Sequence, residues 1–275
     1  MVVFPNAKIN IGLAITGKRG DGYHNIESCF YPVGWCDALE AVESDALSFV
    51  SSGIPIPGKL ADNLCVKAYK IVRRSYDIPP VSIHLHKMIP IGAGLGGGSS
   101  DGTFMIRLLN DLFGLGMDEG EMESLALELG SDCPFFIRNK ARFVSGRGEI
   151  FSDIRLPLES GTMVIVNPGV AISTGEAYSG IKTYSPTGKL KPALENSAVA
   201  DWKDAVGNDF EAPIFGRHPE IRSIKEKLYE MGALYASMSG SGASVYGIFP
   251  AEANAREWFP ASYSVWEGPV ERADR

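Results

Sequence analysis

Apolar and polar residues alternate strictly over residues 6–16 of the chain. The apolar face of this segment consists of Ile9, Ile11, Leu13 and Ile15. Its polar face consists of Asn6, Lys8, Asn10 and Gly12. A period of two predicts a β-strand with its two sets of side chains on opposite sides of a sheet. A turn-rich loop at 17–25 and further strands through residue 50 are expected to follow.

Apolar residues three and four positions apart predict four helices, over residues 62–76, 101–110, 118–129 and 220–231. The apolar stripe of the second consists of Phe104, Met105, Leu108, Leu109 and Leu112. Asp118 with Glu121 resembles a capping box, and Gly130 supplies a stop for the third helix. Pro219 and Gly232 flank the fourth, as is typical of helix ends.

A strand-like segment with His84 and His86 on one face lies at 81–87, and further strands are expected over 163–166 and 245–249. Residues 184–200 are rich in Pro, Ser, Gly and Lys, so we expect a mobile surface stretch there. Strands and helices are mixed without regular βα alternation. The fold class that this order favours is α+β rather than a doubly wound sheet.

The run PIGAGLGGGSS at 90–100 places five glycines within seven residues, directly before the helix predicted from residue 101. Glycines leave backbone N–H groups uncovered, and the positive end of a helix dipole favours anions. The run is therefore expected to hold the phosphates of a nucleotide. A flexible linker is the alternative, but the flanking segments are apolar and periodic.

Two better-known phosphate loops do not fit this run. Gly92, Gly94 and Gly97 match the dinucleotide fingerprint, yet the helix is followed by another helix instead of a second strand. A Walker A loop ends in Gly-Lys-Ser/Thr, and the run contains no lysine.

Composition narrows the possible classes of protein. The 275 residues are 45% hydrophobic and carry a net charge of −7, without a Lys/Arg cluster, which argues against nucleic-acid binding. No apolar run approaches the ~20 residues of a membrane span, and the N-terminus does not resemble a signal peptide, so we expect a cytoplasmic protein.

The four cysteines show no CxxC spacing and are expected to be reduced core thiols. His84 and His86 share one strand face, and solvent exposure is a simpler interpretation of this pair than zinc binding.

The order of Lys8, the glycine run and a second small-residue loop at 239–244 resembles the GHMP kinase superfamily. Further segments resemble one of its families, the 4-diphosphocytidyl-2-C-methyl-D-erythritol kinases. These segments are AKINIGLAITGKRGDGYHNIES at 7–28, GSDCPFF at 130–136, NPGVAIST at 167–174, NDFE at 208–211 and MSGSGAS at 238–244. The resemblance spans residues 4 to about 250, and GDGYH is the segment that points to a cytidyl substrate.

The resemblance implies a two-domain GHMP fold with the active site in the cleft between the domains. The expected N-terminal domain, residues 1–156, is nucleotide-binding and similar to domain 2 of ribosomal protein S5. The expected C-terminal domain, residues 157–275, is ferredoxin-like. A change of composition near Leu156 suggests the boundary.

The same resemblance makes Lys8 the catalytic lysine and Asp132 the general base. Without it, Lys8 would be interpreted as a solvated charge and Asp132 as a helix cap before Cys133 and Pro134. The ATP-binding residues that it implies are Pro90, Ile91, Gly92, Ala93, Gly94, Leu95, Gly96, Gly97, Gly98, Ser99, Ser100, Asn63 and Leu64. A cap at Asp62 or Asn63 would explain the last two nearly as well.

Magnesium is expected with ATP, and Ser99 or Ser100 is its candidate ligand, since no dedicated carboxylate cage is evident.

The substrate-binding residues implied by the resemblance are Asn10, Tyr23, His24, Thr174 and Tyr178. Tyr23 is expected to stack on cytosine, His24 to bind the edge of the base, and Tyr178 to supply the opposite stacking face. Gly175 and Glu176 depart from the Pro and apolar residue common at these positions in the family. A surface turn at Tyr23 and His24 is the alternative.

The activity implied is phosphorylation by ATP of the 2-hydroxyl of 4-diphosphocytidyl-2-C-methyl-D-erythritol, in the non-mevalonate pathway to isoprenoid and terpenoid precursors. A GHMP kinase of the homoserine or mevalonate type and a non-catalytic nucleotide-binding module are the alternatives. The expected partner is the small-molecule substrate, and binding to nucleic acid or to a membrane is not expected. The protein is expected to be a monomer or a weak homodimer.

Overall fold

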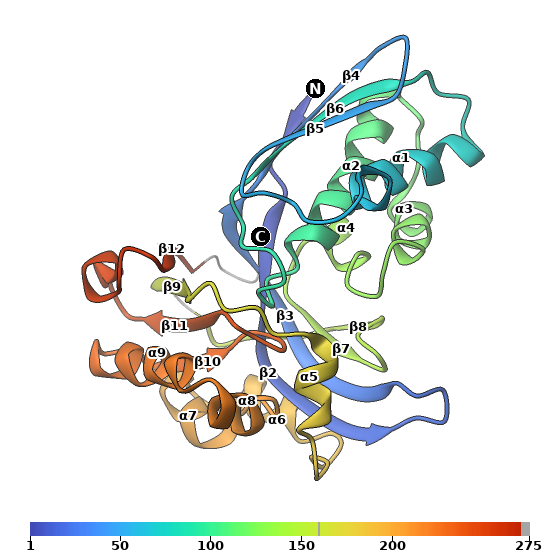
Figure 1. Cartoon of the computed structure of the whole chain (residues 1–275). Coiled ribbons are helices and arrows are strands. Elements are labelled where there is room, and N and C mark those ends of the chain that lie inside the picture. The colour runs from blue at the N-terminus through green and yellow to red at the C-terminus, as the bar shows by residue number, and fades with distance from the viewer. Residues whose placement is uncertain (159, 271–275) are drawn as a thin grey trace. The chain divides into compact units, whose positions relative to one another are not determined.

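The computed structural model describes residues 1–158 and 160–270 (Figure 1). The chain forms two compact units, each assembled from separate stretches of sequence. The first unit consists of Met1–Ala7, Trp35–Ile91 and Gly96–Asn139. The second consists of Lys8–Gly34, Gly92–Leu95 and the chain from Lys140 onward.

The first unit contains a four-stranded sheet in the order β1-β4-β6-β5. Its strands are β1 (Val2–Val3), β4 (Ala38–Glu43), β5 (Ser48–Gly53) and β6 (Val81–Lys87). Only β5 and β6 run parallel in this sheet. In β6, Val81, Ile83 and Leu85 are buried while His84 and His86 are exposed, which confirms the predicted alternation.

The helices of the first unit are η1 (Leu60–Asp62), α1 (Leu64–Ser75), α2 (Gly97–Phe113), α3 (Glu119–Leu127) and α4 (Phe135–Arg138). Helix α2 packs against α1 and against β4. Helix α2 begins four residues before the predicted start, so Gly97 to Ser100 form its first turn. The Asp118 carboxylate accepts a hydrogen bond from the N–H of Glu121, as the predicted cap requires.

The second unit contains two four-stranded sheets. The first has the order β2-β3-β7-β8, with strands β2 (Asn6–Lys18), β3 (His24–Cys36), β7 (Arg142–Ser145) and β8 (Ile150–Asp153). The second has the order β10-β11-β9-β12, with strands β9 (Thr162–Asn167), β10 (Tyr235–Met238), β11 (Val245–Phe249) and β12 (Ser264–Pro269). Every pairing in this second sheet is antiparallel, and all six residues of β9 are buried.

The helical elements of the second unit are α5 (Thr174–Ser179), α6 (Leu190–Asn196), η2 (Val199–Asp201), α7 (Trp202–Ala205), α8 (Glu211–Arg217), α9 (Pro219–Glu230) and η3 (Ala255–Trp258). Helix α9 begins at the expected proline, and Ile221, Ile224 and Leu228 form its buried face. In the part of the chain that the structure describes, no helix has the length and apolar character needed to cross a lipid bilayer.

One expectation about local structure is wrong. Residues 184–200 are not a loop throughout, because α6 and η2 form there and bury Leu190 and Leu194. The polar face of β2 is buried, since Lys8 is 4% exposed and Asn10 is 2% exposed.

The compact units also group the residues differently from the expected division at residues 156 and 157. Most of β2 and β3 belongs with the C-terminal part of the chain. The boundary between residues 156 and 157 predicts that the two parts of the chain fold independently, and it stays a prediction.

Candidate functional site

Lys8 is a fixed, buried cation in the second unit. Its Nζ donates a hydrogen bond to Asn10 Oδ1 at 2.6 Å and lies 4.2 Å from the centre of the Phe30 ring. Asn10 Nδ2 donates to Ser28 Oγ at 2.9 Å, and that hydroxyl donates to the carbonyl of Gly12 at 2.6 Å. This chain of bonds turns the amide oxygen of Asn10 toward Lys8. The interpretation of Lys8 as a solvated charge is therefore wrong.

Two glycine-containing loops meet beside Lys8 within the second unit. Ser239 Oγ donates to the carbonyl of Gly94 at 2.8 Å and accepts from the N–H of Asn10 at 3.2 Å. The N–H of Lys8 donates to the carbonyl of Leu95. Gly94 has a φ of +76°, and a Cβ built on it would lie 2.0 Å from the carbonyl oxygen of Ser239. Only glycine permits so close an approach of the two loops.

In the first unit, the last part of the glycine run is the start of α2. Gly96 is the N-cap in the left-handed conformation, and no side chain caps the helix. The N–H groups of the first turn are therefore left for another acceptor, which suits an anion. Ser99 is half-buried, and the buried Ser100 Oγ has no hydrogen-bond partner among the described residues.

Asp132 lies in the turn between α3 and α4, also in the first unit. The Thr103 hydroxyl lies 2.9 Å from the carbonyl oxygens of both Ser99 and Cys133, and so ties this turn to the first turn of α2. The N-cap position of α4 is held by Pro134, two residues after Asp132. Burial raises the pKa of the neighbouring Cys133 thiol to about 11, so this thiol stays protonated at neutral pH.

Asn63 and Leu64 have structural roles at the start of α1. Asn63 Oδ1 accepts a hydrogen bond from the N–H of Cys65 at 2.9 Å and so caps the helix. A Cβ on Gly102 would lie 2.9 Å from Leu64 Cβ, so α1 and α2 are in close contact at this point. These contacts agree with the capping alternative, and the contact of Asn63 and Leu64 with ATP stays a prediction.

An aromatic cluster forms around His24 in the second unit. The His24 and Tyr178 rings stack with centres 4.6 Å apart and planes inclined by 17°. Tyr178 meets Phe210 edge-on at 4.9 Å, and Tyr184 lies 6.3 Å from His24. Burial, aided by the charge of Lys18, lowers the pKa of His24, so its ring is neutral at pH 7.

The other predicted substrate residues include Tyr23, which adjoins His24 in the sequence. Tyr23 is 58% exposed, and the guanidinium of Arg147 lies 5.0 Å from the centre of its ring. Thr174 is the exposed first residue of α5, whose cap is the Ser173 hydroxyl. Sequence reasoning did not single out Ser28, Phe30 or Phe210. A period-two pattern in β3 would have placed the first two on one face, whereas the contact of Phe210 with Tyr178 joins distant segments.

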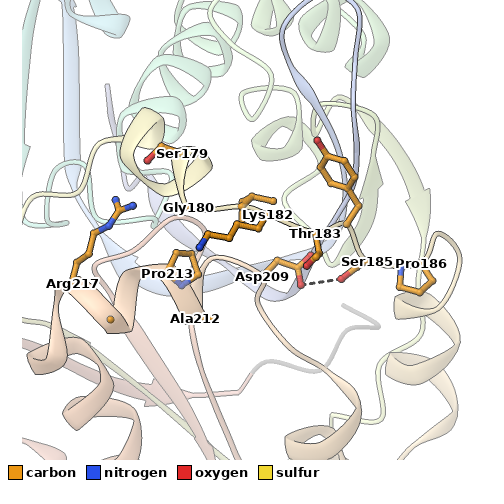
Figure 2. Close-up of a pocket in the computed structure, with 13 residues that line it drawn as sticks. Ser179, Gly180, Lys182, Thr183, Ser185, Pro186, Asp209, Ala212, Pro213 and Arg217 are labelled. Atoms are coloured by element: carbon orange, nitrogen blue, oxygen red, sulfur yellow. Dashed lines mark hydrogen bonds between the residues drawn. The ribbon is translucent and has the colours of Figure 1, made fainter.

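A pocket of about 630 Å³ lies between the segment after α5 and helix α8 (Figure 2). Tyr184, Lys182 and Arg217 line it, and Ser185 Oγ donates to Asp209 Oδ1 there at 3.0 Å. None of the predicted site residues lines this pocket. Through Tyr184 it adjoins the aromatic cluster.

Comparison with known proteins gives a single family. The model described as GHMP kinases N terminal domain matches residues 63–140, and the one described as GHMP kinases C terminal matches residues 190–261. A relative from Parabacteroides distasonis named 4-diphosphocytidyl-2-C-methyl-D-erythritol kinase is 48% identical, over 98% of this chain and 100% of its own length. A relative of the same name from Azobacteroides pseudotrichonymphae is 50% identical, over 90% of this chain and 93% of its own length.

A solved structure agrees with these relatives. The crystal structure of a 4-(cytidine 5'-diphospho)-2C-methyl-D-erythritol kinase superposes with a TM-score of 0.82, covers 98% of each chain and shows 28% sequence identity. The α+β two-domain GHMP fold expected from the sequence is thereby confirmed. The chain belongs to the GHMP kinase family and, within it, to the family of 4-diphosphocytidyl-2-C-methyl-D-erythritol kinases.

Proposed function

We propose that this protein transfers the γ-phosphate of ATP to the 2-hydroxyl of 4-diphosphocytidyl-2-C-methyl-D-erythritol, in the non-mevalonate route to isoprenoid precursors. The observation that carries the proposal is the 48% identity, over 98% of the chain, with a relative of that name. Membership of the family makes the protein a kinase, and the acceptor is inferred from the names of the relatives.

In this proposal Lys8 stabilises negative charge on the transferred phosphoryl group. Phosphoryl transfer depends mainly on positioning and on electrostatic stabilisation of the transition state. A lysine that Asn10 and Phe30 hold in place needs little reorganisation when charge develops. Its burial also removes water that would otherwise screen the charge.

Asp132 is assigned to the acceptor hydroxyl in the same proposal. A carboxylate is able to orient the hydroxyl and to accept its proton as the new P–O bond forms. The Thr103 hydroxyl fixes the turn that carries Asp132. Because that turn is tied to the first turn of α2, a carboxylate and an anion-binding helix start are held together within one unit.

The glycine run from Pro90 to Ser100 is proposed to bind the ATP phosphates. A magnesium ion bound with ATP would neutralise part of the phosphate charge. Its preference is for oxygen ligands, which the Ser99 and Ser100 hydroxyls offer, and the unpartnered Ser100 Oγ fits this role. No cluster of three or more His, Cys, Asp or Glu suited to a metal occurs among the described residues. The phosphates of ATP would therefore supply most of the oxygen ligands of the ion.

The aromatic cluster is proposed to bind the cytosine base. Tyr178 and Tyr23 offer flat faces, and a neutral His24 offers one donor and one acceptor to the edge of the base. Thr174 and Asn10 are proposed as further polar contacts of the substrate.

We place the enzyme in the cytoplasm, as a monomer or weak homodimer.

A product assay tests the proposal. The protein is incubated with ATP, Mg²⁺ and the cytidyl acceptor, and mass spectrometry is used to detect the gain of one phosphate. Homoserine and mevalonate are offered in parallel. Phosphate on either of these and not on the cytidyl compound would favour another GHMP activity. Intact ATP binding with no phosphorylated product would favour a non-catalytic module.

A further inference from the structure

Three ionisable side chains are buried together beneath the start of α2 in the first unit. Asp37 is 1% exposed, and Lys87 and Asp101 are each 3% exposed. Lys87 Nζ donates hydrogen bonds to Asp37 Oδ2 and, at 2.6 Å, to Asp101 Oδ2. Burying such charges is costly unless they are paired, and removing one partner leaves the others uncompensated.

The cluster joins the two ends of the glycine run. Asp37 Oδ1 accepts hydrogen bonds from the N–H groups of Met88 and Ile89, which directly precede Pro90. Asp101 directly follows the first turn of α2, which ends the run. Lys87 therefore connects the entry of the run with its exit.

The start of α2 also lies in direct contact with the cluster. A Cβ built on Gly97 would lie 3.0 Å from Lys87 Nζ and 3.0 Å from Ile89 Cγ2. The glycine at position 97 thus permits a close approach of the helix to Lys87. Any displacement of Lys87 would be transmitted to the backbone of this first turn.

We propose that Asp37, Lys87 and Asp101 form a positioning cluster that fixes both ends of the glycine run, so that the N–H groups of the first turn of α2 are preorganised for the phosphates of ATP. The proposal rests on the proposed function. All three side chains are buried, so they act through the backbone and not by contact with the nucleotide. Preorganised donors raise affinity because less ordering is left for the moment of binding.

The charge of the cluster adds a pH dependence to this arrangement. Burial raises the pKa of Asp101 to about 8; Lys87 opposes the rise and the charge of Asp37 adds to it. The Cys65 thiol of α1 is a further titratable neighbour, and burial raises its pKa well above its ordinary value, so it stays uncharged. Asp101 Oδ1 accepts no hydrogen bond in the part of the chain that the structure describes.

Below pH 8, the lysine charge is therefore balanced by one carboxylate charge. Above pH 8, a second negative charge forms under the phosphate-binding turn and opposes an anionic ligand. ATP binding is expected to weaken across this pH range in the wild-type protein.

Three variants test the cluster, with KM for ATP, KM for the acceptor, kcat and melting temperature measured at pH 7 and pH 9. Lys87→Met is expected to raise KM for ATP by about tenfold or more while KM for the acceptor changes less than about threefold. Asp101→Asn keeps the shape of the side chain but cannot ionise, so the increase in KM for ATP between the two pH values should disappear. Arg74→Gln breaks an exposed ion pair with Glu128 in the same unit and should behave like wild type.

Calorimetric titration with ATP separates failure of this proposal from failure of the proposed function. If the wild type binds ATP but does not phosphorylate the cytidyl acceptor, the proposed function fails and the cluster is judged on ATP affinity alone. Equal losses toward ATP and acceptor in folded Lys87→Met would mean a general structural role. If Lys87→Met does not fold, Asp101→Asn decides, and an unchanged pH dependence of ATP affinity in it overturns the proposal.

Discussion

At the scale of single residues, Lys8 shows how a strand holds a charge inside a protein. Removing an ammonium group from water is unfavourable unless other groups replace the solvent. Asn10 accepts one of its hydrogen bonds and Phe30 presents a ring face, so two contacts from the same sheet partly replace water. Ser28 then fixes the direction of the Asn10 amide. The position of this cation is thus determined by two neighbouring strands.

Asp132→Asn is expected to lower kcat by roughly 10²-fold or more, the usual range for loss of a general base, with little change in ATP affinity. The amide keeps the shape of the side chain but accepts a proton poorly. Steady-state kinetics and calorimetric titration with ATP measure the two effects. Asp111→Asn, which removes an exposed carboxylate on α2, is the matched control. Near-normal turnover in folded Asp132→Asn would exclude this residue from proton transfer.

Gly94→Ala is expected to raise KM for ATP by about tenfold or more, because a methyl group would force the two loops apart. The strain arises from the positive φ and from the carbonyl of Ser239. Gly17→Ala is the control in the same unit, since a Cβ at position 17 meets no atom within 4 Å. Wild-type kinetics in both variants would show that the contact of the loops does not shape the nucleotide site.

Tyr178→Ala is expected to weaken binding of the cytidyl substrate by about 1–3 kcal/mol, the usual value of one base-stacking contact. Tyr23→Ala should have a smaller effect, because Tyr23 is 58% exposed and contacts Arg147 instead of the stacked pair. KM values for the cytidyl and uridyl compounds compare the two variants. A larger loss in Tyr23→Ala would make Tyr23 the principal stacking residue, as the family resemblance implies.

At the scale of elements, local patterns were sufficient where neighbours in the sequence determine the structure. The alternation of β6, the Asp118 cap and the proline at the start of α9 were all predicted correctly. Helix α6 was missed because Pro186, Gly188 and Pro192 lie in or near it and are typical of loops. Leu190 of α6 packs on Gly12 of β2, where a Cβ would lie 2.6 Å from Leu190 Cδ1. This long-range contact covers part of the polar face of β2 and could not be inferred from the local pattern of α6.

The buried cluster beneath α2 predicts a pH-dependent stability. Because burial raises the pKa of Asp101 to about 8, the folded protein holds this proton more tightly than the unfolded chain does. The resulting stabilisation is complete below the ordinary pKa of an aspartate and is lost as pH rises through 8. Melting temperatures between pH 6 and 9 should therefore fall more steeply for wild type than for Asp101→Asn. Parallel curves for the two proteins would contradict the raised pKa.

At the scale of the whole molecule, the sequence motifs did not indicate how the candidate site residues are grouped in the fold. Lys8, residues 92–95 and Ser239 come together in one unit, while Asp132 and the first turn of α2 belong to the other. The backbone passes between the units five times, after residues 7, 34, 91, 95 and 139. Composition changes along the chain cannot reveal such interleaving, because it depends on which strands pair. From composition alone, the sequence suggests one boundary, near Leu156, and this boundary stays a prediction.

The interleaving predicts that residues 157–275 do not fold cooperatively on their own. The core of the second unit includes Leu13, Ile15 and Ile26, which this fragment lacks. Burial of three such side chains contributes about 5–9 kcal/mol, comparable with the whole stability of a typical domain, about 5–15 kcal/mol. The fragment also loses the backbone bonds that join Leu13 to Gly207 and Asp209.

Thermal unfolding monitored by circular dichroism, together with binding of a hydrophobic dye, tests this expectation on the fragment with the full chain as control. We expect a broad transition and strong dye binding for the fragment, and a sharp transition with weak dye binding for the full chain. Helices α8 and α9 would then keep part of their secondary structure, while the exposed faces of β9 and β11 bind the dye. A sharp transition in the fragment would mean that its own strands and helices suffice for a stable core, and would support the predicted boundary near Leu156.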